Sequence, residues 1–196
     1  GDMNKLDASE FPVLNMLNTR YFIFPLQGGQ TAPLPNPFAL GNAWFVDEVQ
    51  YVSNANEEIE AIHGLNPQQT AVVDKKFESI VKSIPSDAMD TIELVTYEPN
   101  YLKYEVDSEK GGTVVFSEIY YPGWQSTIDG QEAAHGRANY ILRAMNVPAG
   151  KHVVEFRFDP KSLHTTETIA FIALGLLALL AVVVIVMKIK ACRKVG

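Results

Sequence analysis

The second half of the chain contains six short runs that decide its fold: TIELVTYEP (residues 91–99), NYLKYEVDS (100–108), TVVFSEIYYP (113–122), WQSTIDG (124–130), NYILRAMNVP (139–148) and HVVEFRFDP (152–160). Apolar and polar residues alternate in most of them, β-branched and aromatic residues are frequent, and Gly, Pro and Asn separate the runs. Asp129-Gly130 is typical of a two-residue hairpin loop. Strands at this spacing predict an antiparallel β-sandwich or jelly-roll-like domain, mainly β (α+β) with a few short helices.

Residues 1–90 predict a mixed α/β portion of the same domain. Gln27–Pro37 is predicted as a loop, since two glycines and three prolines break both helices and central strands. A further amphipathic turn is expected around Phe77–Val81. The expected regular elements are a helix at Ala8–Asn18 capped by Ser9, strands at Arg20–Phe24, Ala43–Val52 and Thr70–Val73, and a helix at Asn56–Leu65 capped by Asn56.

The run Ile169–Met187, IAFIALGLLALLAVVVIVM, holds 19 residues without a charged side chain. As a helix it would be about 28 Å long, close to the ~30 Å hydrocarbon core of a bilayer. A buried helix of a soluble protein is the alternative, but such a helix usually keeps a polar stripe, which this run lacks. The sequence therefore predicts one C-terminal transmembrane helix.

The charges on the two sides of this run predict its orientation. Lys188, Lys190, Arg193 and Lys194 follow it, whereas residues 1–167 carry 12 Lys and Arg against 23 Asp and Glu, a net charge of −11. The positive-inside rule then places residues 1–167 outside the bacterial cell membrane and the tail in the cytoplasm. A tail-anchored protein would have the opposite orientation.

The expected division of the chain is an N-terminal α/β portion (1–90), a β-sandwich portion of the same domain (91–163), a linker with the transmembrane helix (164–187) and a basic tail (188–196). No export signal is recognisable in residues 1–30, so an outward domain would need upstream membrane segments of the same protein as partners. Gly1-Asp2-Met3 resembles the remnant of a removed tag, as in a fragment cut for expression.

The stretch from Val115 to Leu163 carries an ordered set of motifs: YYPGW, the Asp129-Gly130 turn, RANYILRA, VPAGKHVVEFRF and PKS, directly before a membrane helix. Together with LNMLNTRYFI and NPFALGNAWFV nearer the N-terminus, this order resembles the C-terminal end of the bacterial YfhO-like membrane protein family. The resemblance implies a polytopic protein with a membrane core of the type that transfers sugars from lipid-linked donors, acting in surface polymer or glycolipid glycosylation. The catalytic acidic residues of such a core would lie in an early outward loop, so no catalytic residue is carried over to this sequence.

Several classes of site are not indicated by the sequence. It contains no nucleotide-binding glycine pattern, no P-loop and no nucleophile elbow, and its four histidines lack metal-ligand spacing, so no cofactor or metal is expected. The only cysteine, Cys192, lies in the basic tail, so no disulfide is expected in the domain. The acidic net charge argues against nucleic acid as a partner.

The candidate ligand site is an aromatic and polar set that could stack on sugar faces and bind hydroxyl groups. The alternative is that these aromatic residues build the core and that YPGW is an ordinary turn. Arg137 and Arg143 could also pair with Glu118, Asp129 or Glu132 across strands. The candidate saccharide-binding residues are Tyr120, Tyr121, Trp124, Arg137, Asn139 and Tyr140.

Three functions remain open on the sequence. The first is a non-catalytic accessory domain of a glycosyltransferase-like membrane protein that binds or guides a saccharide acceptor. The second is a structural module that packs on its own membrane core, with membrane lipid nearby and no ligand. The third is a hydrolase using Glu118 and Asp129, which requires carboxylates about 5–10 Å apart in a cleft.

Overall fold

A computed structural model describes residues 10–26 and 28–195, with the side chains of these residues except those of 161 and 191–195. The chain divides into two compact units, Gly1–Phe158 and Asp159–Gly196. We call residues 10–158 the β domain. It is mainly β, with antiparallel and mixed sheets and few helices, which confirms the predicted fold class.

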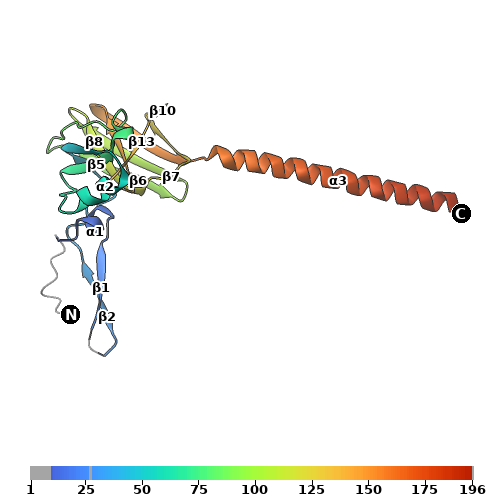
Figure 1. The fold of residues 1–196 in the computed structure, drawn as a ribbon, viewed down its shortest axis with the longest axis horizontal. Helices are drawn as coiled ribbons and strands as arrows, with labels where there is room; N and C mark the ends of the chain where they lie inside the picture. The colour runs from blue at the N-terminus through green and yellow to red at the C-terminus, as the bar shows by residue number, and fades with distance from the viewer. Residues whose placement is uncertain (1–9, 27, 196) are drawn as a thin grey trace. The chain divides into compact units, whose positions relative to one another are not determined.

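Three sheets make up the β domain (Figure 1). A two-stranded hairpin pairs β1 with β2, a five-stranded sheet has the order β10-β9-β13-β7-β6, and a six-stranded sheet has the order β3-β8-β12-β11-β5-β4. The elements are α1 (Pro12–Met16), β1 (Tyr21–Pro25), β2 (Thr31–Pro35), β3 (Ala43–Val46), β4 (Glu48–Val52), α2 (Ala55–Ile62), β5 (Thr70–Asp74), β6 (Thr91–Glu98), β7 (Tyr101–Ser108), β8 (Gly112–Ile119), β9 (Trp124–Ile128), β10 (Gln131–Glu132), β11 (Gly136–Ala138), β12 (Leu142–Val147) and β13 (Gly150–Phe158), with a 3-10 turn at Lys75–Phe77.

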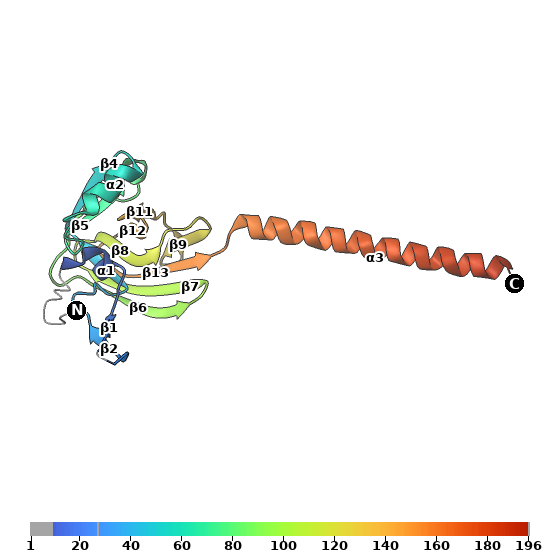
Figure 2. The ribbon, with the colours of Figure 1, turned by 60° about the horizontal axis from the view of Figure 1, so that its bottom comes forward.

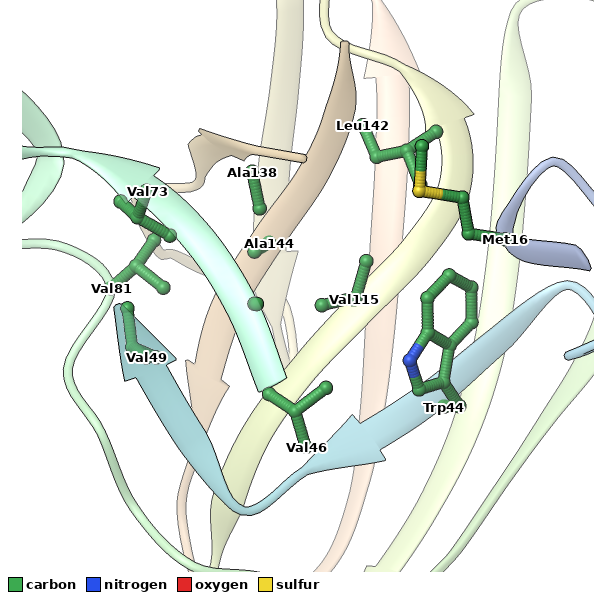
Figure 3. Packing of buried hydrophobic residues seen from close by; sticks show 11 residues of the cluster. Met16, Trp44, Val46, Val49, Val73, Val81, Val115, Ala138, Leu142 and Ala144 are labelled. Atoms are coloured by element: carbon green, nitrogen blue, oxygen red, sulfur yellow. The ribbon is translucent and has the colours of Figure 1, made fainter. Parts of the chain in front are cut away.

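The six-stranded sheet curls on itself. Its two edge strands, β3 and β4, are consecutive in the chain and only Asp47 separates them, so opposite edges of the sheet must come together at this corner. The side chains inside the curl form the first hydrophobic core (Figure 3), to which β3 contributes Trp44 and Val46, β8 contributes Val115 and β12 contributes Ala144. Met16 of α1 belongs to the same core, so the helix covers one opening of the curl.

Strand β8 is shared by two cores. Val115 lies in the first core, whereas its neighbours Val114 and Phe116 lie in a second core against the five-stranded sheet. In the second core the ring of Phe116 makes edge contacts with Tyr104 and Phe156, at centroid distances of 4.9 and 4.8 Å. Figure 2 shows β4 and α2 on one side of β8, and β6, β7 and β13 on the other. Gly112 is needed here, because an added Cβ would lie 2.6 Å from the Phe45 ring.

The six predicted strands of residues 91–160 all form, as β6, β7, β8, β9, β12 and β13. The Asp129-Gly130 hairpin is also confirmed: Ile128 pairs with Gln131, and φ is +52° at Asp129 and +77° at Gly130, as a type I′ turn requires. The predicted strands at 20–24 and 70–73 correspond to β1 and β5. Alternation and turn chemistry were sufficient for these elements because each is decided locally.

Four predictions for residues 1–90 were wrong in detail. The strand expected at Ala43–Val52 is two strands broken at Asp47, and the loop expected at Gln27–Pro37 contains β2. The expected cap Asn56 is inside α2; the cap is Asn54, whose side chain accepts hydrogen bonds from the backbone N–H groups of Asn56 and Glu57. The helix predicted at Ala8–Asn18 is the shorter α1, and Ser9, like Gly1-Asp2-Met3, lies outside the described residues.

The second unit is a single helix, α3 (Lys161–Val195). Its segment Ser162–Lys190 has a mean hydropathy of 3.3 in its most apolar 18-residue window and is long enough to cross a membrane. No part of that window is buried against protein. By length and composition α3 is therefore a candidate membrane span, as the sequence predicts.

Candidate functional site

The six candidate saccharide-binding residues lie in two clusters. Tyr120, Tyr121 and Trp124 follow β8 or begin β9, whereas Arg137 lies in the middle of β11 and Asn139 and Tyr140 form the turn to β12. The backbone N–H of Tyr120 donates to the carbonyl of Ile141 at 2.7 Å, which brings the two segments together. Their side chains nevertheless have different partners, so each cluster is described separately.

The first cluster, which we call the aromatic end, consists of Tyr121, Trp124, Phe158 and the guanidinium group of Arg143. The rings of Trp124 and Phe158 are 5.4 Å apart, and those of Tyr121 and Phe158 are 6.2 Å apart. Trp124 and Phe158 are cross-strand partners at the start of β9 and the end of β13. Tyr121 is 59% exposed, so the cluster presents an aromatic surface to its surroundings.

Arg143 supports the aromatic end from inside the domain. Its guanidinium carbon lies 4.0 Å from the centroid of the Trp124 ring and 5.1 Å from that of Phe156, and the side chain is buried. Its Nε–H donates to the carbonyl of Ile119 at 3.0 Å. Burial lowers the pKa of Arg143 below its ordinary value, and the charge of Glu118 opposes this shift. Cation–π contacts in a desolvated site stabilise by about 2 kcal/mol, so Arg143 fixes the orientation of Trp124.

Tyr120 and His135 lie next to this cluster and face the interior. The Tyr120 ring packs against Phe77 and His135, at centroid distances of 5.4 and 5.7 Å. His135 Nδ1 is 2.7 Å from the hydroxyl oxygen of the buried Ser126. Burial, with a smaller effect of the nearby Arg143, lowers the pKa of His135 to about 4. At neutral pH His135 is therefore an uncharged part of the core.

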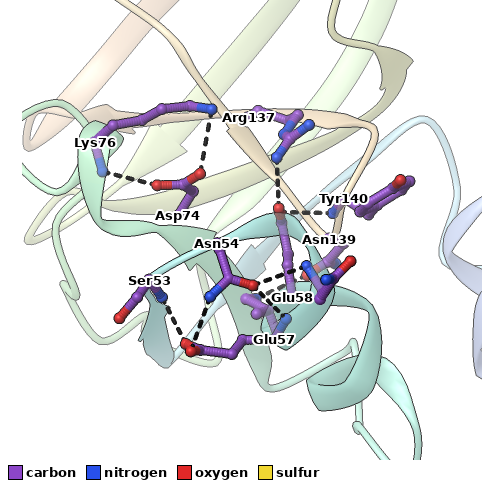
Figure 4. A network of polar contacts seen from close by, with 11 residues as sticks. Ser53, Asn54, Glu57, Glu58, Asp74, Lys76, Arg137, Asn139 and Tyr140 are labelled. Atoms are coloured by element: carbon purple, nitrogen blue, oxygen red, sulfur yellow. Dashed lines mark hydrogen bonds and ion pairs between the residues drawn. The ribbon is translucent and has the colours of Figure 1, made fainter.

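The second cluster, which we call the Glu58 network, consists of Glu58, Arg137, Asn139 and Tyr140 (Figure 4). Glu58 of α2 is fully buried. Its carboxylate accepts from the Arg137 guanidinium at 2.6 Å and from the Tyr140 backbone N–H at 2.8 Å. Burial raises the pKa of Glu58, and the hydrogen bond from Tyr140 and the charge of Arg137 oppose the shift. The network connects α2 to the turn between β11 and β12.

Asn139 extends the pairing of β11 with β5. Its backbone N–H donates to the carbonyl of Val72 at 2.7 Å, and its side-chain Oδ1 accepts from the Val72 N–H at 2.8 Å. Asn139 and Tyr140 have φ values of +49° and +72°. Asn tolerates this region, whereas a residue such as Tyr does so at a cost of about 1 kcal/mol or more. The hydrogen bond from the Tyr140 N–H to Glu58 offsets this strain.

The most apolar pocket near these clusters, about 470 Å³ in volume, lies between α1, α2 and the Asn139–Ile141 segment. Phe11, Val13, Ile59 and Ile62 are among its lining residues. A pocket of this composition suits an apolar group and offers few polar partners to a sugar.

The two carboxylates of the hydrolase hypothesis have separate partners. Asp129 accepts a 2.8 Å hydrogen bond from the Val153 N–H and lies 2.6 Å from His152, and these contacts lower its pKa. Glu118 is half-buried near Arg143, and burial raises its pKa. Within the described part of the chain, no group of three or more His, Cys, Asp or Glu residues could hold a metal ion.

Sequence reasoning missed the roles of Glu58 and Arg143. Glu58 is one of three glutamates near the start of a predicted helix. Their favourable interaction with the helix dipole already explained why acidic residues occur there, so nothing in the sequence indicated that Glu58 is buried. Arg143 alternates with apolar residues in LRAMNV, and its position on the buried face of β12 was the signal that could have identified it.

Replacing Glu58 with Gln should destabilise the β domain by about 2–3 kcal/mol, because hydrogen bonds to a charged acceptor are lost and an amide N–H₂ faces another donor. Urea unfolding of the chain in detergent micelles measures the change. Glu60→Gln, on the exposed side of the same helix, is the matched control and should change stability by less than about 0.5 kcal/mol. An equal or more stable Glu58→Gln variant would show that the desolvation of the carboxylate outweighs its pairing.

His135 should make the stability of the β domain depend on pH. Its folded pKa, about 4, is below the ordinary value of 6.5, so its contribution is complete above pH 6.5 and is lost as the pH falls toward 4. The shift corresponds to about 3 kcal/mol. Urea unfolding at several pH values should show that the wild-type chain loses this much more stability than His135→Gln between pH 7 and pH 4. Parallel curves for the two proteins would contradict the assignment.

The comparison with protein families gives one result. Residues 63–188, almost two thirds of the chain, match the family described as bacterial membrane protein YfhO. The match covers β5 to β13, both clusters except Glu58, and most of α3. Neither a curated protein nor a solved structure matches the chain. The matched region contains the whole five-stranded sheet, four of the six strands of the larger sheet and most of the apolar helix. The chain therefore belongs to the YfhO family of bacterial membrane proteins.

Proposed function

We propose that the β domain is a non-catalytic, extracytoplasmic accessory domain of a polytopic, glycosyltransferase-like membrane protein, and that its aromatic end binds a saccharide acceptor. Membership of the YfhO family supports the membrane location. The observation that carries the saccharide assignment is the arrangement of Tyr121, Trp124 and Phe158 over the buried Arg143.

The charge distribution supports the orientation. Four basic residues follow the apolar run, whereas residues 1–167 have a net charge of −11. The energy of moving Lys and Arg across a bilayer keeps such tails on the cytoplasmic side. The domain and the tail are therefore on opposite sides of the membrane, with residues 1–167 outside.

The aromatic end has the properties of a sugar-stacking surface. A rigid ring offers contact area to the apolar C–H face of a sugar and loses little conformational entropy on binding. Trp124 is fixed by its contacts with Arg143 and Phe158, and the exposed Tyr121 ring also lies next to Phe158. The ligand would stack on Tyr121 and on the accessible part of Trp124.

The Glu58 network supports a structural role for the other half of the predicted site. Arg137 is already paired with Glu58, the side-chain Oδ1 of Asn139 accepts from the Val72 N–H, and Asn139 is fully buried. We therefore limit the saccharide site to the aromatic end. The same pairing favours the second candidate function, a structural module that packs on its own membrane core and binds no ligand.

The proposed orientation predicts that Cys192 is reached only from the cytoplasm. A membrane-impermeant maleimide should leave intact cells unlabelled at this cysteine and should label it after permeabilisation. As a control, Met89→Cys in a Cys192→Ser background should be labelled in intact cells, because Met89 is 84% exposed in the β domain. Labelling of Cys192 in intact cells, with no labelling at position 89, would show that the tail is outside the cell and the β domain inside, the opposite of the proposed orientation.

Saccharide binding predicts saturable quenching of Trp124 fluorescence when oligosaccharides of neutral and amino sugars are added to the chain in detergent. The other tryptophan, Trp44, is buried and its indole N–H donates to the Pro67 carbonyl, so a Trp124→Phe variant should lose the signal. Tyr121→Ala should weaken binding about tenfold, equivalent to about 1.4 kcal/mol.

The matched control is Tyr21→Ala, since Tyr21 has a similar exposure, 61% against 59%, and lies in the separate β1–β2 sheet. It should leave the affinity unchanged. A silent titration of a folded protein with every oligosaccharide would reject the saccharide site and leave the structural module.

A further inference from the structure

The β1–β2 hairpin is a two-stranded sheet with no third strand among the described residues. Tyr21 and Ile23, on one face of β1, are 61% and 73% exposed. Near its base the Phe22 ring lies 6.1 Å from the Phe11 ring, in a tilted arrangement. A two-stranded hairpin with uncovered apolar side chains is marginally stable in water, so it needs another surface to cover it.

The hairpin differs from the rest of the β domain in charge. Residues 21–35, YFIFPLQGGQTAPLP, contain no Asp, Glu, Lys, Arg or His, although residues 1–167 carry a net charge of −11. Three of the first four residues are Tyr or Phe. An uncharged, aromatic surface on an acidic domain selects a partner that is itself apolar and does not repel the domain.

The prolines of the hairpin occupy positions where the backbone nitrogen points away from the partner strand. Asn36 N–H donates to the Arg20 carbonyl and Leu26 N–H donates to the Gln30 carbonyl. Hydrogen-bonded pairs alternate along an antiparallel ladder, so the pairs 22/34 and 24/32 are also hydrogen-bonded. The outward positions are then 21, 23 and 25 on β1, and 31, 33 and 35 on β2, and Pro25, Pro33 and Pro35 occupy half of them.

This placement has two consequences. A further strand cannot pair well with the β2 edge, where Pro33 and Pro35 remove two of the three outward N–H groups, and Pro25 removes one of three on the β1 edge. The prolines also remove half of the outward backbone N–H groups. In a low-dielectric environment these groups would have no hydrogen-bond partner, so their absence lowers the cost of placing the hairpin there. The prolines thus disfavour strand addition, mainly at β2, and favour contact through the faces of the hairpin with an environment that contains little water.

We propose that the β1–β2 hairpin lies in the interfacial layer of the bilayer, with Tyr21 and Ile23 among the lipid headgroups and the first acyl carbons. Aromatic side chains are enriched in this layer, which still contains water for the remaining free N–H groups. The chain itself keeps the domain near a membrane, because residues 159–168 are all that separate β13 from the apolar run of α3. Because the hairpin carries no charge, anionic lipid headgroups do not repel it, although they repel the acidic remainder of the domain.

The test is the collision rate of a nitroxide spin label with oxygen, which concentrates in lipid, and with a water-soluble nickel chelate. The label is attached to Ile23→Cys in a Cys192→Ser background, with the full chain in phosphatidylcholine nanodiscs. The exposed position 23 should accept the label without unfolding the domain, and Tyr21→Cys gives a second reporter on the same face. Met89→Cys, at 84% exposure between Asp87 and Asp90, is the control.

The ratio of oxygen to nickel collisions should be several-fold higher at positions 21 and 23 than at position 89. Equal ratios at all three positions would overturn the proposal, because the hairpin would then be in water. Protection of positions 21 and 23 from both reagents would also overturn it, since a second copy of the chain or another protein would then cover the hairpin. Neither result depends on saccharide binding at the aromatic end.

Discussion

Strand β8 is buried on both of its faces, and the β domain is organised around this strand. Val115 packs inside the curled six-stranded sheet, whereas Val114 and Phe116 pack against the five-stranded sheet. One strand can belong to both cores because successive side chains point to opposite faces. The rest of the architecture follows: the six-stranded sheet must curl to enclose its own core, and its outer face must receive β7 and β13.

Buried polar side chains connect elements of the β domain in addition to the apolar packing of the two hydrophobic cores. Among the described residues, the segment from β4 through α2 to β5 contains the only parallel strand pair. Glu58 connects α2 to β11, the neighbour of β5, and to the turn that follows β11. Arg143 has a comparable role in the second core, where its guanidinium group lies between the Trp124 and Phe156 rings and pairs with a carbonyl. Removing a partner from a buried charge of this kind is costly, because the charge that remains is poorly compensated.

The same packing changes how the candidate site is interpreted. Arg137, Asn139 and Tyr140 have the residue types of a sugar site, but the Arg137 Nη2, the Asn139 Oδ1 and the Tyr140 backbone N–H connect β11, β5 and α2. Tyr121 and Trp124 are different, because the Tyr121 ring is exposed and the partly buried Trp124 ring packs on Arg143 without a side-chain hydrogen-bonding role of this kind among the described residues. The aromatic end and the β1–β2 hairpin are therefore two surfaces of the domain on which apolar and aromatic groups remain available to a partner.

The sequence by itself determined the strands of residues 91–160, the Asp129-Gly130 turn, the apolar helix and the family, because alternation, turn residues and hydrophobic length act over a few neighbouring residues. Local pattern could not show that Ala43–Val52 bends at Asp47 to join two opposite sheet edges, since the bend depends on strands about seventy residues away. Local pattern also could not show that Arg137 and Asn139 have structural partners, whereas Tyr121 and Trp124 belong to the aromatic end. Only the tertiary structure decided this, because whether a polar side chain is free for a ligand depends on which distant groups, here Glu58 and Val72, folding brings to it.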